Sequence, residues 1–181
     1  MGVQETLKLV GLRAKMRFGF ASPEDRGQLV VKSLMMILNH LHATVHWTQV
    51  AEGARDMAST PEILRGINRD AYTKRVEQIV EEYGMDRDEA LGLEPDKFFG
   101  MAGRVILQRG VIHAIVSSTT LESQRQRSLA AIREEFGKRA QNPSLSSEMH
   151  GVFQWFYTTG FDEAVALGEM QRDLIQNPQS H

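Results

Sequence analysis

Residues 12–41, LRAKMRFGFASPEDRGQLVVKSLMMILNHL, contain the pattern that decides the fold class. In the first nine of these residues, apolar side chains alternate with polar positions that include Arg13, Lys15 and Arg17. This period of two predicts a β-strand over 12–20 with its apolar face buried. The remaining residues carry helix-capping signals and then apolar side chains at helical spacing. A helix is therefore expected directly after the strand.

The start of that helix is well marked. Ser22 is a favourable N-cap residue, Pro23 stands at the first helical position, and Asp25 is placed to complete a capping-box arrangement. The apolar residues that follow keep helical spacing as far as residue 41. The β-branched and aromatic composition of residues 44–50 is typical of a second strand. We therefore expect the helix to end near the histidines that precede this segment.

The rest of the chain carries the signs of a helical bundle. A second cap-plus-proline signature occurs at Thr60 and Pro61, and Gly84 is placed to end the helix that it starts. A buried strand is the alternative for 111–120. We expect the further helices over 86–92, from 95 onward, over 121–140, over 145–159 and over 162–175.

These elements predict an α+β fold that is predominantly α-helical, with a small N-terminal β element and a helical bundle. At this length, one domain over residues 1–181 is expected. The alternative is a subdivision into a β/α element over 1–50 and a helical bundle over 60–176.

The amino-acid composition excludes several kinds of site. The chain of 181 residues has 21 Lys and Arg, 23 Asp and Glu, and no cysteine. The lack of thiols excludes disulfides, cysteine nucleophiles and Cys-ligated zinc or iron–sulfur sites. The net charge alternates in blocks, with +3 over 1–50, −5 over 51–100, +4 over 101–140 and −4 over 141–181. Alternating blocks favour contact between copies, or between lobes of one copy, over a uniformly basic binding face.

No stretch approaches the ~20 apolar residues of a membrane span, and the N-terminus lacks the apolar core of a signal peptide. We therefore expect a protein that is cytoplasmic, or intracellular within a host, without a membrane partner. The first six residues, MGVQET, also match the short N-myristoylation pattern at Gly2, which stays open as an alternative.

Three histidines, His40, His42 and His46, fall within seven residues. On a strand all three rings share one face, whereas on a helix only His42 and His46 do so. Imidazole is a common ligand of zinc, copper, nickel and iron, so a transition-metal site is one hypothesis for this cluster. Because the segment does not match HExxH and no acid stands beside the rings, structural or surface histidines are preferred. No cofactor is expected.

Two basic clusters are candidates for contact with nucleic acid or phosphate. On the predicted strand, Arg13, Lys15 and Arg17 stand in a row about 7 Å apart, near the spacing of successive phosphates. The second cluster lies on the expected helix from Arg125 to Arg139. Its candidate contacts are Arg125, Arg127 and Arg133. Solvated faces are the alternative for both clusters, because acids at helical spacing accompany the second.

Four aromatic residues, Phe153, Trp155, Phe156 and Tyr157, follow one another closely. Three successive positions cover most of a helix circumference, so these rings are not expected to face one core together. A surface of this kind is typical of an interface with another subunit.

The sequence contains no GxGxxG, GKS/GKT or GxSxG motif, and no catalytic constellation is expected. The leading expectation is a non-enzymatic, α-rich assembly or adaptor protein that self-associates as a homo-oligomer. A phage or viral structural component would fit this class. The alternative is a nucleic-acid-binding module that uses the basic N-terminal strand and the Arg125–Arg139 helix. A His-ligated metal protein is the third hypothesis.

Overall fold

Helix α2 (Pro23–Gly53) begins where the sequence predicts, in a computed structural model that describes residues 21–53 and 62–176. The Asp25 amide donates to Ser22 Oγ at 3.1 Å, and the Ser22 amide donates to the Asp25 carboxylate at 3.2 Å. This capping box satisfies two amides near the start of the helix. The predicted start is confirmed.

The strand predicted over residues 44–50 is wrong, because α2 continues through the histidines to Gly53. Leu41, Val45 and Thr48 are all buried, at the spacing of one helix face. Burial of this continuous stripe outweighs the preference of β-branched side chains for strands, which depends strongly on context. The helix therefore does not end at the histidines.

The predominantly α-helical character is confirmed, and the described residues contain no strand. The strand predicted over 12–20 lies outside them. A strand over 111–120 is excluded, because a helix runs as far as Val116. After α2 the elements are α3 (Glu62–Tyr83), α4 (Arg87–Gly92), α5 (Pro95–Val116), α6 (Glu122–Ala140), α7 (Ser147–Trp155), the π-helical turn η2 (Phe156–Gly160) and α8 (Phe161–Gln176).

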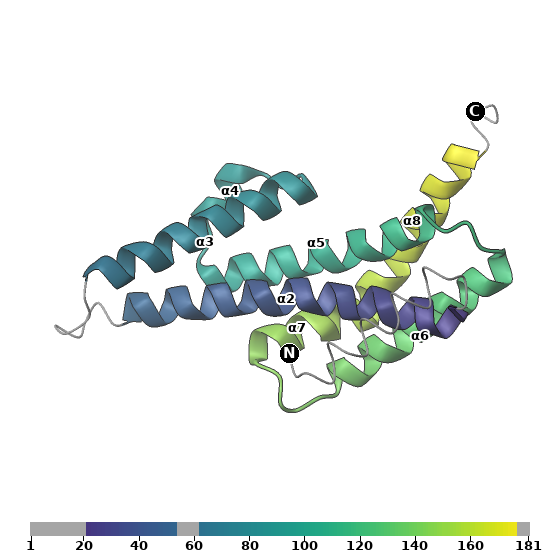
Figure 1. The fold of residues 1–181 in the computed structure, drawn as a ribbon, viewed down its shortest axis with the longest axis horizontal. Helices are drawn as coiled ribbons and strands as arrows, with labels where there is room; N and C mark the ends of the chain where they lie inside the picture. Colours follow the sequence, from purple (N-terminus) through teal and green to yellow (C-terminus); the bar gives the residue numbers. More distant parts are fainter. Residues whose placement is uncertain (1–20, 54–61, 177–181) are drawn as a thin grey trace.

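The helices are arranged around an antiparallel central pair, α2 and α5 (Figure 1). Helix α3 covers one side of this pair and carries α4, and α6 and α7 lie on the other side. Helix α8 packs on α5, and its final turns extend away from the bundle.

Glycines permit the close contacts between helices. A Cβ atom at Gly27 of α2 would lie 2.6 Å from the Ser128 carbonyl oxygen of α6.

A cluster of aromatic rings joins α6, α7 and α8. Phe136, Phe153 and Phe156 are fully buried, and the Phe136 and Phe156 rings meet edge to face with centroids 4.9 Å apart. Between α7 and α8 the helix widens into the π turn, where the Phe161 amide donates to the Phe156 carbonyl five residues earlier. The buried residue Gly160 leaves room for the Trp155 ring. The expected division at Gly160 is therefore a widened turn and not a break.

Candidate functional site

The histidine cluster separates on the surface of α2. His42 faces α7, where its Nε2 lies 2.8 Å from Ser146 Oγ and 3.8 Å from a Glu148 carboxylate oxygen. Its ring also meets the buried Phe99 edge to face at 5.2 Å. His40 and His46 are exposed. In the described part of the chain, no three His, Cys, Asp or Glu side chains are grouped closely enough to hold a metal ion.

Ser146, His42 and Glu148 are the residue types of a hydrolase triad, but their geometry is different. Both the serine and the carboxylate approach the same imidazole nitrogen, Nε2. A triad needs the carboxylate on the opposite nitrogen, where it orients the ring and stabilises the imidazolium. In addition, Ser146 Oγ caps α7 by accepting from the Met149 amide at 3.3 Å. The arrangement acts as a structural link between α2 and the start of α7.

The local electrostatics stabilise Glu148 in its charged form. A hydrogen bond from the Ser147 hydroxyl, at 2.7 Å, is the main cause of a Glu148 pKa below its usual value. The backbone amide of the same residue adds to this effect, because Glu148 lies in the first turn of α7. Negative charge is therefore favoured at this helix end.

The first arginine of the basic helix α6 forms a contact inside the molecule. Arg125 is buried, and its guanidinium donates to both carboxylate oxygens of Glu169 in α8, at 2.9 and 3.0 Å. A guanidinium held in this bidentate way is a strong structural contact. Arg125 is therefore not available to a phosphate in this conformation.

Arg133 is also paired, with both oxygens of Asp162 at 2.9 and 3.1 Å, and its guanidinium lies over the Phe161 ring. At the end of the same helix, Lys138 and Arg139 pair with neighbouring glutamates. Arg127 is exposed, without an ion pair among the described residues. The other predicted nucleic-acid contacts, Arg13, Lys15 and Arg17, lie outside those residues, as does Gly2.

The aromatic side chains of residues 153–157 pack mostly against other residues of this chain. Phe153 and Phe156 are fully buried. Trp155 is half-buried beneath the Arg104 guanidinium, which lies 5.0 Å from the ring centroid. Tyr157 is 36% exposed and packs against Gly137 of α6. The surface of this segment that a partner could contact is therefore limited to the outer side of Tyr157 and part of Trp155.

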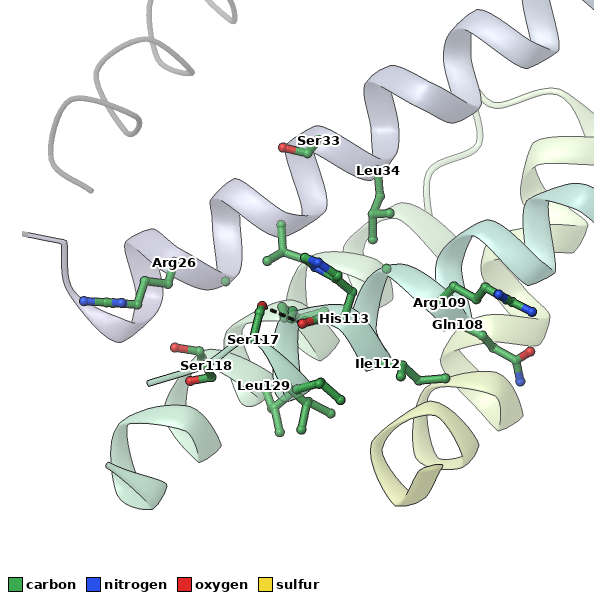
Figure 2. A pocket seen from close by; sticks show the side chains of 18 of the residues that line it. Arg26, Ser33, Leu34, Gln108, Arg109, Ile112, His113, Ser117, Ser118 and Leu129 are labelled. Atoms are coloured by element: carbon green, nitrogen blue, oxygen red, sulfur yellow. Dashed lines mark hydrogen bonds between the residues drawn. The ribbon is translucent and has the colours of Figure 1, made fainter. Parts of the chain in front are cut away.

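A groove of about 1350 Å³ runs along the first half of α2 and the second half of α5 (Figure 2). The end of α3 lines it at Glu82 and Tyr83, and so does the connection that follows α5, residues 117–120. We call this feature the α2–α5 groove. Its apolar lining includes Leu29, Val30, Ile37, Val105 and Ile112.

Most of the polar residues that line the groove are uncharged, and the charged ones are mainly basic. Arg26 and Arg109 lie far apart along the groove, and His113 lies between them (Figure 2). No carboxylate of the described residues pairs with either arginine. Ser117 Oγ donates to the His113 carbonyl at 2.6 Å, which holds the end of α5 in place. An apolar surface with unpaired cations suits an amphipathic ligand that carries negative charge.

Four exposed apolar side chains on α8 form a second feature, which was not anticipated from the sequence. Leu167, Met170, Leu174 and Ile175 are 42%, 54%, 45% and 66% exposed. We call them the α8 stripe. From Met170 to Gln176 no residue of α8 is buried. A detectable signal was present, since α8 has more apolar residues than the buried face of Phe161, Ala164 and Gly168 requires.

Comparison with known proteins gives no relative: no family model, no curated protein and no solved structure matches this chain. Among the helices described here, none combines the length and apolar character needed to cross a membrane.

Proposed function

We propose that this chain is a non-enzymatic helical protein that functions by assembling with copies of itself, using the α8 stripe as contact surface. The observation that carries this proposal is the continuous exposure of Leu167, Met170, Leu174 and Ile175 on a helix end that leaves the bundle (Figure 1). Contiguous apolar surface of this kind is typical of protein contact sites, whereas single exposed apolar residues are ordinary.

The size of the stripe indicates how strong the association can be. Burying a Leu, Ile or Met side chain completely is worth about 1.5–3 kcal/mol, so four half-exposed side chains contribute on the order of 4 kcal/mol per copy. Two stripes therefore contribute on the order of 8 kcal/mol. Because association costs about 4–15 kcal/mol, the stripes need further contact surface to hold a stable complex.

The structural role of the Ser146–His42 contact supports the non-enzymatic part of the proposal. Both Ser146 and Glu148 are directed at one imidazole nitrogen, and the serine already caps α7. The arginines of α6 are likewise used to hold α8, through Glu169 and Asp162. In this part of the chain, reactive and charged side chains join helices to one another.

Sedimentation velocity over a range of micromolar concentrations tests the proposal. The native chain should form a reversible oligomer, and Met170→Lys should shift it to monomer because a charge would be buried in the contact. Met36→Lys is the matched control, since Met36 is an exposed methionine on α2, 39% accessible. A native chain that stays monomeric contradicts the proposal. Dissociation by Met36→Lys but not by Met170→Lys contradicts it as well, because the α8 stripe would then not be part of the contact.

A further inference from the structure

We infer that the α2–α5 groove is the receptor for the projecting end of α8 from a second copy, and that two copies exchange these helices reciprocally. The inference rests on the proposed function and names the surface that the α8 stripe contacts. Three observations carry it: the occupant of the neighbouring part of the groove, the continuity of the two surfaces, and the charge of the groove lining.

Helix α3 shows what kind of element fits between α2 and α5. It packs against both helices and buries Val76, Ile79, Val80 and Tyr83, a helical face with the spacing i, i+3, i+4, i+7. Tyr83 is the last residue of α3 and lines the groove, so the groove continues where α3 stops. Gly84, at φ 58°, turns the chain away at this point. The groove is therefore the uncovered continuation of a surface that already binds an amphipathic helix.

The α8 stripe has the pattern that this surface accepts. Leu167, Met170 and Leu174 have the spacing i, i+3, i+7, which matches Val76, Ile79 and Tyr83 in α3. The stripe belongs to a helix that is already formed, so docking does not require a segment to fold first. A preformed helix that enters a helix-sized groove has a lower entropic cost than a disordered segment.

The groove and the stripe are continuous on one copy. Leu167 is part of the stripe and, together with Gln171, also lines the groove. A second copy related by a twofold axis can therefore place its α8 in the first groove while its own groove receives the first α8. A stable interface involves about 20–30 residues on each side, more than four stripe residues provide, and reciprocal exchange supplies this larger area.

Charge favours α8 over the first twenty residues of the chain as occupant. Arg26 and Arg109 line the groove without a carboxylate partner in the described part of the chain. Residues 1–20 contain four Lys and Arg against one acid, so they would add positive charge to this surface. Asp173 adjoins Leu174 of the α8 stripe, has no ion pair among the described residues, and would bring a carboxylate to the groove. Glu82 is an acid in the groove lining, next to Tyr83 at the α3 end.

Cross-linking between single cysteines tests the arrangement cleanly, because the native chain has none. Ser33→Cys places a thiol in the groove, and Ile175→Cys places one at the end of the stripe while Leu167, Met170 and Leu174 remain. An equimolar mixture of the two variants, one carrying a mass tag, should give the mixed cross-linked dimer with a short bis-maleimide. Asp88→Cys is the control partner, since that side chain is 97% exposed on α4, and it should give no such dimer.

A groove-blocking variant gives an independent readout. Ser33→Trp should raise the dissociation constant by about tenfold or more, because the added ring occupies space that α8 needs. Its circular dichroism and thermal unfolding show whether the monomer still folds.

The remaining outcomes separate the two proposals. A protein that self-associates but cross-links Ile175→Cys only to itself has an α8–α8 contact, which overturns the groove inference and leaves self-assembly standing. A strict monomer overturns both. An intramolecular cross-link in the double variant Lys15→Cys/Ser33→Cys assigns the groove to residues 1–20 and overturns the inference.

Discussion

Arg125 of α6 and Glu169 of α8 form a bidentate ion pair with contacts of 2.9 and 3.0 Å, in which the arginine is 8% exposed. A second bidentate pair, Arg133 with Asp162, joins the same two helices at the surface, where the side chains are 46% and 62% exposed. The two pairs share chemistry and differ in burial. Comparing variants of the two pairs therefore shows how much burial changes the contribution of an ion pair to the free energy of unfolding.

Removing the acid of the buried pair should be costly. Glu169→Gln leaves the Arg125 guanidinium buried without its counter-charge, which costs about 3–5 kcal/mol when both partners are buried. Because Glu169 is 27% exposed, we expect about 2 kcal/mol, reduced by solvent screening. Asp162→Asn should cost less than about 1 kcal/mol. Urea titrations of the two variants check this, and equal losses would show that burial is irrelevant to the pair.

Glycine substitutions should have opposite signs at two helical positions. Gly27→Ala places a Cβ 2.6 Å from the Ser128 carbonyl oxygen and 2.9 Å from Ala131 Cβ, so α2 and α6 must separate. We expect a loss of about 1–3 kcal/mol. At Gly100 of α5 nothing lies within 4 Å, so Gly100→Ala should stabilise by about 0.5–1 kcal/mol through helix propensity. Thermal unfolding distinguishes the two, and a stabilising Gly27→Ala would contradict the close α2–α6 contact.

The decrease of the free energy of unfolding at acid pH should depend on Glu148. Hydrogen bonding, first from Ser147, holds its pKa in the folded state below the usual 4.5. The charged carboxylate therefore stabilises the fold above that pH, and this contribution is lost as the pH falls through the lowered value. Glu148→Gln should be less stable than the native chain at neutral pH, and the two should converge in acid. A difference that stays constant into strongly acidic buffer is the contrary result, measurable by urea titration at each pH.

The pairing of the α6 arginines restricts any binding of nucleic acid through this helix. Arg127 is exposed and has no ion pair among the described residues, whereas Arg125 and Arg133 are engaged. We expect Arg127→Glu to reduce the salt dependence of binding to a random duplex by about one phosphate contact. Arg133→Ala should change it by less. A larger effect at Arg133 would mean that its pair with Asp162 opens on binding.

Local signals correctly predicted the start of α2 and the end of α3. The capping box of Ser22 and Asp25 and the helix end at Gly84 both depend on the chemistry of a few adjacent residues. The strand over 44–50 was wrong for the opposite reason. Its β-branched residues favour a strand locally, but Leu41, Val45 and Thr48 are buried by α3, α5 and other helices that come later in the chain.

The proposed contact surfaces could not be predicted from the sequence in the same way. The aromatic residues at 153–157 do exceed one helix face, but the widened turn and the glycines beside it give most of them places within the chain. The excess of apolar residues in α8 is visible in its sequence, but the exposure of Met170 and Leu174 in particular depends on where α8 leaves the bundle. The groove likewise exists because α3 stops at Tyr83.

The π turn at Phe156–Gly160 sets the rotational phase between α7 and α8. It accommodates one more residue than an α-helical turn does, and Thr158 Oγ1 donates to the Gln154 carbonyl within it at 2.8 Å. A regular α-helix over the same residues would add the rotation of one residue, and so would turn everything downstream by up to about 100°. Glu169 would then turn away from Arg125, and the α8 stripe would turn away from its present direction. The widening of this one turn thus controls which side of the terminal helix faces outward, and with it the geometry of any assembly that the helix forms.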